Sequence, residues 1–191
     1  MTEWTTVLWT DARELARQSG VEEEHLPTSE VSPRAHFHAL RKSADRVQAV
    51  GFMAAALPRA EAIAWAAACL APLAERKEYP PVRRNLLDYA QRWIDQPSDE
   101  FRRAMFAQAE QASEDSPEKL LGYAIFFSGG SISDPDLEPV NGDPAVTGHL
   151  VAGAIISAAV LKREETNAFL DKALDLGEKV AVSGTDALTK T

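Results

Sequence analysis

Residues 116–161, SPEKLLGYAIFFSGGSISDPDLEPVNGDPAVTGHLVAGAIISAAVL, hold two apolar segments separated by one polar loop. The first segment begins at Ser116-Pro117, a pair that caps a helix and fills its first position. It stops at Ser128-Gly129-Gly130, and a loop rich in proline and aspartate leads to a second start signal, Asp143-Pro144. The second segment runs to Leu161 without a charged residue. Two such segments are best placed at the centre of a helical core, so this stretch predicts an all-α fold.

The rest of the chain shows similar helix start and stop signals. Helices are expected after Asp11, after Pro58, at 82–95, after Ser98 and at 164–179, from capping residues and from apolar residues at helical spacing. The apolar segment 47–57 is compatible with a further helix despite Gly51. Short junctions marked by proline force consecutive helices to pack side by side. The sequence therefore predicts a single-domain bundle of about six or seven helices, packed as successive hairpins.

The expected bundle occupies residues 47–180. Residues 1–46 are interpreted as an N-terminal segment and an irregular polar arm, since 21–46 show no clear period and contain Pro27 and Pro33. Residues 181–191 are small and polar, and we expect a flexible tail.

Composition excludes some classes of function. The chain has 191 residues and a formal net charge of −9, with no basic cluster beyond short pairs such as Arg83-Arg84. Binding to nucleic acid is therefore not expected. Acidity of this size aids solubility and can steer a basic partner. Cys69 is the only cysteine and lies in an apolar run, so we interpret it as a small buried hydrophobe.

No membrane span is expected. Residues 145–161 are apolar, but this segment is at the lower limit of a spanning helix and carries Thr147, His149 and Ser157. The first residues lack the basic and apolar regions of a signal peptide. We therefore expect a buried core helix in a cytoplasmic protein.

No catalytic residue, cofactor or metal ligand is assigned from the sequence. His149 lies on an apolar helix, where a neutral imidazole bonded inside the core is the expected state. Ser128-Gly129-Gly130 follows a helix, whereas a phosphate-binding loop precedes one, so it is interpreted as a helix end. The acidic residues of the next loop alternate partly as in a calcium loop, but prolines and a missing glycine break the pattern.

Two surfaces are candidates for protein binding. Trp4 and Trp9 lie in a nonhelical segment, so they either fold back on the body or anchor a partner, as exposed aromatic residues often do. The second surface is the loop after the first apolar helix. The candidate binding residues are Trp4, Trp9, Ser128, Ser131, Asp134 and Asp136.

Four motifs together carry a family resemblance: EAIAWAAACL at 61–70, PSDEFRR at 97–103, FFSGGSI at 126–132 and TGHLVAGA at 147–154. Over residues 47–162 the chain resembles an uncharacterised bacterial family, a domain of unknown function of about this size. The resemblance carries no established activity or site residues. It implies an association with contact-dependent secretion loci, particularly type VI, and hence an adaptor or co-chaperone role.

The sequence thus favours a non-enzymatic accessory protein that binds another protein, such as an effector or its loading chaperone. One alternative is an immunity protein that neutralises a toxin. Another is an enzyme with an unfamiliar helical site, in which His149, Ser128 and the loop acids converge.

Overall fold

The computed structural model describes residues 3–27, 31–43 and 45–189, and nine α-helices make up most of this part of the chain. It confirms the all-α class. The helices are α1 Ala12–Gln18, α2 Pro33–Lys42, α3 Arg46–Ala56, α4 Arg59–Ala74, α5 Pro81–Asp95, α6 Asp99–Gln111, α7 Pro117–Phe127, α8 Pro144–Val160 and α9 Thr166–Ser183. Three short 3₁₀ turns complete them, η1 Glu23–His25, η2 Arg163–Glu165 and η3 Gly184–Ala187.

The helix count exceeds the expected six or seven, partly because the arm at 21–46 is not irregular throughout. Its Pro33–Lys42 portion is the helix α2. The Ser32 hydroxyl accepts a hydrogen bond from the amide of Ala35, and Pro33 occupies the first turn. Phe37 and Leu40 are buried, one helical turn apart. The burial of this apolar face stabilises a helix that also contains five arginine, histidine and lysine residues.

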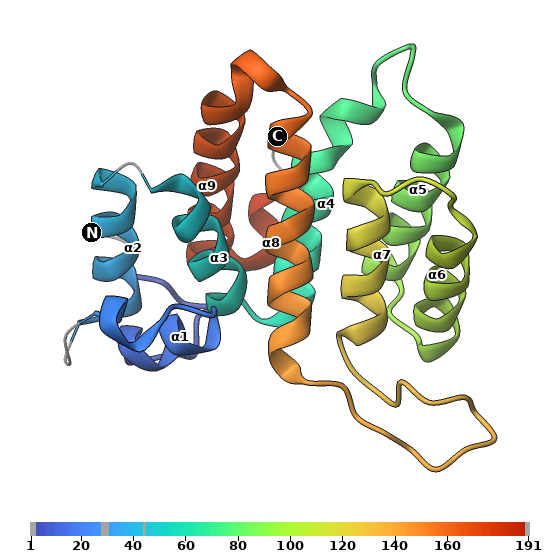
Figure 1. Cartoon of the computed structure of the whole chain (residues 1–191), viewed down its shortest axis with the longest axis horizontal. Helices are drawn as coiled ribbons and strands as arrows, with labels where there is room; N and C mark the ends of the chain where they lie inside the picture. Colours follow the sequence, from blue (N-terminus) through green and yellow to red (C-terminus); the bar gives the residue numbers. More distant parts are fainter. Residues whose placement is uncertain (1–2, 28–30, 44, 190–191) are drawn as a thin grey trace.

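The helices pack as hairpins around a central element. In Figure 1, α2, α3 and α9 lie on one side, α4 and α8 in the middle, and α5, α6 and α7 on the other side. Neighbours in sequence contact each other from α4 to α8, as the short junctions predict. Helix α8 also contacts α3, α4 and α9, so it connects the two sides of the bundle.

The core is continuous and largely aliphatic. Trp65 of α4 is fully buried, and its indole N–H donates to the carbonyl of Ala173 in α9 over 2.8 Å. A Cβ placed on Gly177 would lie 3.0 Å from both Met53 Cγ and Trp65 Cε2, so this glycine permits the close approach of α9. Cys69 is buried, as expected, and burial raises the pKa of its thiol.

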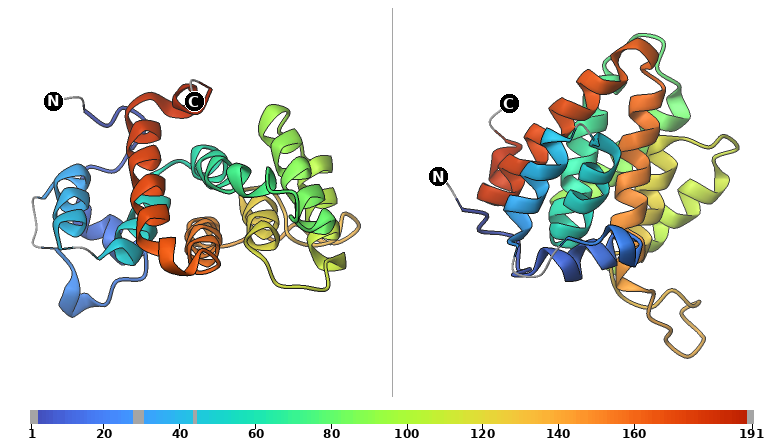
Figure 2. Two further views of the ribbon diagram at one scale, coloured as in Figure 1. Left: turned by 90° about the horizontal axis from the view of Figure 1, so that it is seen from above. Right: turned by 60° about the vertical axis from the view of Figure 1, so that its left-hand side comes forward.

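The N-terminal segment lies beside the end of α9 (Figure 2). The backbone N–H groups of Thr5 and Thr6 both donate to the carbonyl of Ala181, at 3.0 and 3.2 Å. The hydroxyl of Thr5 donates to the carbonyl of Val182 over 2.6 Å. These bonds satisfy carbonyls that the last turn of a helix leaves without partners.

The tail expected at 181–191 is more regular than anticipated. Helix α9 continues to Ser183, and the 3₁₀ turn Gly184–Ala187 follows it. Residues 190 and 191 lie outside the described residues. Over the described part of the chain, every helix is too short or too polar to cross a membrane, as the sequence predicted.

Candidate functional site

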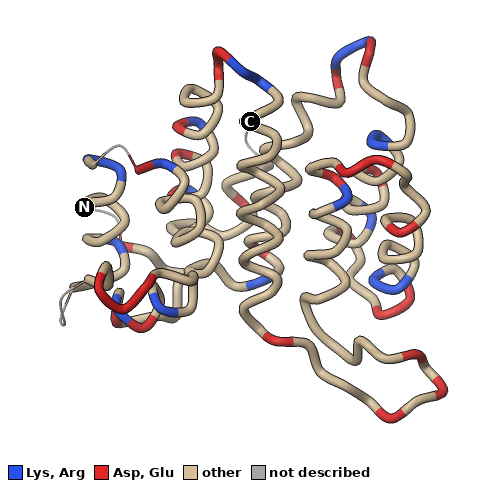
Figure 3. The backbone as a smooth tube through the Cα atoms, viewed as in Figure 1, with Lys and Arg blue, Asp and Glu red and all other residues tan. Residues whose placement is uncertain are grey.

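The loop that joins α7 to α8, residues 128–143, projects beyond the ends of the helices (Figure 1). We call it the acidic loop. Asp134, Asp136 and Glu138 are exposed along it, and it contains no lysine or arginine. Figure 3 shows these acidic positions at its outer edge. Two apolar side chains are also open to solvent, Leu137 at 63% and Val140 at 52% exposure.

Two arginines of α6 hold the base of the acidic loop. Arg102 is buried, and its guanidinium donates to the carbonyls of Phe126 at 2.6 Å and Ser131 at 2.7 Å. Arg103 also donates to the carbonyl of Ser131, at 3.1 Å. Asp99 accepts hydrogen bonds from both guanidinium groups, which lower the pKa of its carboxyl. A charged, bidentate anchor therefore fixes the start of the loop to the bundle.

The loop also closes on itself. The Ile132 amide donates to the carbonyl of Val140 over 2.8 Å, next to a single antiparallel bridge between Ser131 and Asn141. The Ser131 Oγ accepts from the amide of Val140 at 3.1 Å. The hydroxyl of Ser133 donates to the carbonyl of Glu138 at 2.7 Å. Because its backbone is held at both sides, the loop presents its tip in a defined conformation.

The predicted binding residues of this region separate into two groups. Asp134 and Asp136 lie at the exposed tip. Ser128 and Ser131 are partly buried and have internal hydrogen bonds. The Ser128 hydroxyl donates to the carbonyl of Ile125 at the end of α7, over 2.7 Å. The interpretation of this sequence as a helix end is confirmed, and Gly130 next to it has a positive φ of 69°.

The two N-terminal tryptophans pack against the body. The ring of Trp4 lies 5.4 Å from that of Phe37, centroid to centroid, and Trp9 is also partly buried against the core. Trp9 lines a cavity of about 370 Å³, together with Arg59 and the first turn of α8. Of the two arrangements considered from the sequence, folding back on the body and projecting to anchor a partner, the structure shows the first. Their role in protein binding stays a prediction.

His149 does not lie in the core, so the expectation of a buried histidine was wrong. It is exposed on the outer side of α8, and its Nε2 lies 3.7 Å from where a Cβ on Gly20 would stand. The surrounding sequence is apolar on every side of the helix and so does not reveal which side faces solvent. The Ser128 hydroxyl, the nucleophile that an enzyme built around His149 would need, donates instead to the carbonyl of Ile125.

A buried polar cluster was not anticipated. Glu118 in the first turn of α7 is fully buried and accepts hydrogen bonds from Tyr79 and from Arg83, whose Nε is 2.6 Å away. Burial and the Glu118 carboxylate raise the pKa of Tyr79. Arg83 and Tyr79 also line a surface cavity of about 460 Å³. The only sign of this cluster in the sequence is an acidic residue at a helix N-terminus, and this position does not identify the residues that bond to it.

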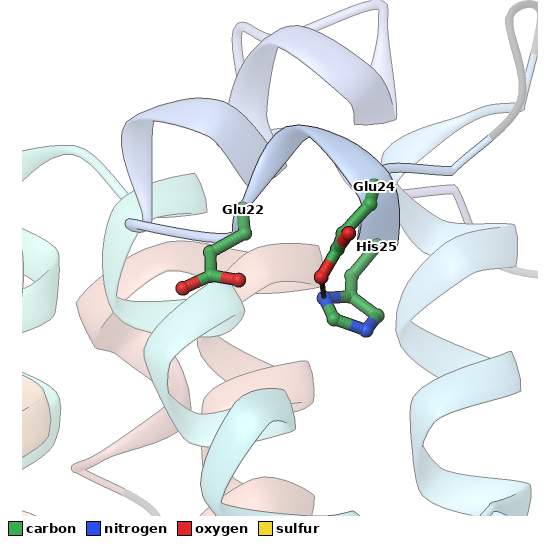
Figure 4. A group of neighbouring side chains, drawn as sticks. All are labelled: Glu22, Glu24 and His25. Carbon is green, nitrogen blue, oxygen red and sulfur yellow. Dashed lines mark ion pairs between the residues drawn. The ribbon is translucent and has the colours of Figure 1, made fainter.

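One group of side chains has the composition of a metal site. Carboxylate oxygens of Glu22 and Glu24 and a ring nitrogen of His25 lie within 4.8 Å of one another, on and beside η1 (Figure 4). All three residues are exposed, and His25 Nδ1 is 3.8 Å from a Glu24 oxygen. Two oxygens and one imidazole could ligate a divalent ion with water in the remaining positions. His36 and His38, in contrast, lie on α2, and His38 pairs with Glu178 at 3.1 Å.

Comparison with known proteins gives one match. Residues 36–181 match a family of unknown function (DUF6931). No curated protein matches the chain, and no solved structure matches it.

Proposed function

Because the chain belongs to DUF6931, whose function is unknown, we propose a function from its own geometry: it is a non-enzymatic accessory protein that binds another protein through the acidic loop. The single observation that carries this proposal is the anchored, projecting tip, where Leu137 is 63% exposed among carboxylates. A solvated leucine gains free energy when a partner covers it. The carboxylates favour a basic partner and increase its rate of association.

The order of the loop supports a binding role. An apolar side chain on a disordered segment must lose conformational freedom before it can bind, whereas this segment is already restrained. Arg102 and Arg103 restrain it through backbone carbonyls, which leaves the side chains at the tip available. The proposed partner is an effector or its loading chaperone, and the role is that of an adaptor or co-chaperone in a bacterial secretion system.

Capture from the native host tests this proposal. The tagged wild type is compared with a loop variant, Asp136→Asn with Leu137→Ser, by quantitative mass spectrometry of co-purifying proteins. The matched control makes equivalent changes on α5, Asp88→Asn with Val82→Ser, replacing an exposed aspartate and an exposed aliphatic residue. We expect a stoichiometric partner that the loop variant loses and the control retains. The proposal fails if the wild type recovers no stoichiometric partner, or if both variants recover it equally.

An acidic surface also fits a toxin domain, so an immunity protein is the second candidate. The identity of the captured protein separates the two. A secretion effector or chaperone supports the adaptor role, whereas a toxin whose activity falls on binding supports neutralisation.

A further inference from the structure

The outer face of α8 is unusual for a surface helix. Its segment Pro144–Val160 contains no charged residue, although such helices normally carry charge on the side that faces water. Val160 is 61% exposed and the following Leu161 is 57% exposed. Ile156, one turn earlier, is partly buried. An apolar strip therefore follows the second half of α8 on its open side.

This strip continues into a groove against α7. A cavity of about 590 Å³ lies between the two helices, which pack side by side (Figure 1). Its apolar lining combines Leu120 and Tyr123 of α7 with Ile156, Val160 and Leu161 at the end of α8. The hydroxyl of Tyr123 donates to Glu110 of α6 over 2.5 Å, so a carboxylate lies beside the aromatic ring. A groove of this kind accepts the apolar side of a helix.

Carboxylates lie on the α7 side of the groove. Asp115 lines it, and Glu110 accepts a hydrogen bond from the hydroxyl of Tyr123, which also lines it. Residues 110–119 contain four acidic residues and one basic residue, Lys119. Three of the four, Glu110, Glu114 and Asp115, are exposed. Lys119 is already engaged, 3.7 Å from Asp115 and bonded to the carbonyl of Ala112.

We propose that the α7–α8 groove binds an amphipathic helix of the partner protein, with apolar residues on one face and lysine or arginine on its flank. The proposal rests on the protein-binding function proposed above and names the chemistry of the partner. Leu120, Ile156 and Val160 contact its apolar face, while the carboxylates of the rim attract its basic side chains. A second copy of this chain is a poor occupant, because its own groove would bring the same exposed carboxylates, Glu110, Glu114 and Asp115, against those of the first.

The test uses synthetic peptides of about 18 residues, which form about five helical turns. The probe is a fluorescent peptide of leucine and lysine with leucine at helical spacing. One comparison peptide has the same composition in scrambled order, and another has glutamate in place of lysine. Fluorescence anisotropy with the full-length protein should give about tenfold weaker binding for each comparison peptide.

Two protein variants locate the site. Val160→Lys places a positive charge in the groove and should weaken binding of the leucine–lysine peptide about tenfold. Val82→Lys, at a position that is 55% exposed on α5, adds the same charge outside the groove and should leave binding unchanged. Circular dichroism confirms that both variants retain their helices.

Each of four results would overturn the groove proposal. The first is equal affinity for the ordered and scrambled peptides, and the second is wild-type affinity in Val160→Lys. The third is self-association of the wild type in sedimentation velocity that Val160→Lys abolishes, since a second copy would then occupy the groove. If Val160→Lys still captures the native partner while the loop variant does not, the groove proposal fails and the function proposed for the acidic loop stands.

Discussion

Substitution of Arg102 by methionine tests how the acidic loop is held. The Arg102 side chain is only 5% exposed. Methionine keeps an unbranched chain in this buried position but removes the guanidinium. The bond to the carbonyl of Phe126, at 2.6 Å, is buried and is lost completely. The carbonyl of Ser131 loses its hydrogen bond from Arg102 but keeps the one from Arg103, so the stabilisation at Ser131 is lost only in part. A hydrogen bond from a charged group contributes about 1.5–3 kcal/mol, and we expect a total loss of about 3 kcal/mol.

This loss has two measurable consequences. For a domain of this size each kcal/mol lowers the Tm by about 2–4 °C, so Arg102→Met should lower it by about 6–12 °C. The amide of Ile132, which bonds Val140 across the loop, should exchange its hydrogen faster, because the base of the loop is released. Thermal unfolding by circular dichroism and hydrogen exchange by mass spectrometry measure the two effects.

Arg92→Met is the matched control. Arg92 is exposed on α5 and lies over the ring of Tyr89 at 5.5 Å, so its loss should change stability by no more than about 0.5 kcal/mol. Equal changes of Tm in the two variants, with unaltered exchange at Ile132, would refute the anchoring role of Arg102.

Three further predictions concern the body of the protein. Gly177→Ala should destabilise the protein by about 1–3 kcal/mol, because the new methyl group overpacks α9 against its neighbours. Gly51→Ala, whose methyl group meets open space in α3, should stabilise the protein by about 0.5–1 kcal/mol. Denaturant unfolding that gave changes of the same sign for both variants would contradict this packing. Trp4→Ala with Trp9→Ala should cost about 2–4 kcal/mol, since both rings pack against the core, and an unchanged Tm with loss of partner capture would instead assign them to a binding surface. Folding raises the pKa of Tyr79, so its contribution to stability is complete below the ordinary tyrosine pKa of about 10 and is lost as the pH rises through the folded pKa. Tyr79→Phe should therefore reduce the loss of stability above about pH 10. An unaltered dependence of stability on alkaline pH would argue against this assignment.

Local signals predicted much of the helical architecture. Ser116-Pro117 and Asp143-Pro144 begin α7 and α8 as expected, and the serine and aspartate side chains accept backbone N–H groups in both caps. The same Ser-Pro signal stands at Ser32-Pro33, where polar composition led to the expectation of an irregular arm. Capping chemistry is short-range and visible in sequence, while the burial of Phe37 that stabilises α2 depends on distant elements.

The candidate site was predictable only in part. The exposed acidic residues of the loop could be predicted from its composition, but the hydrogen bonds from Arg102 and Arg103 that hold its base could not. Arg102 bonds the carbonyl of a residue 29 positions away, and every residue carries a carbonyl, so no residue type marks the acceptor. His149 was misplaced for a related reason: α8 is apolar on all sides, and only the packing of its neighbours determines which side remains open.

The threonines before α1 close a long stretch of chain. Thr5 and Thr6 bond carbonyls 174 to 177 residues further along. Contacts between residues so distant in sequence are slow to form, because closing a long loop costs conformational entropy before the contact repays it. Docking of the segment around Thr5 onto the end of α9 is therefore expected to be a late step of folding.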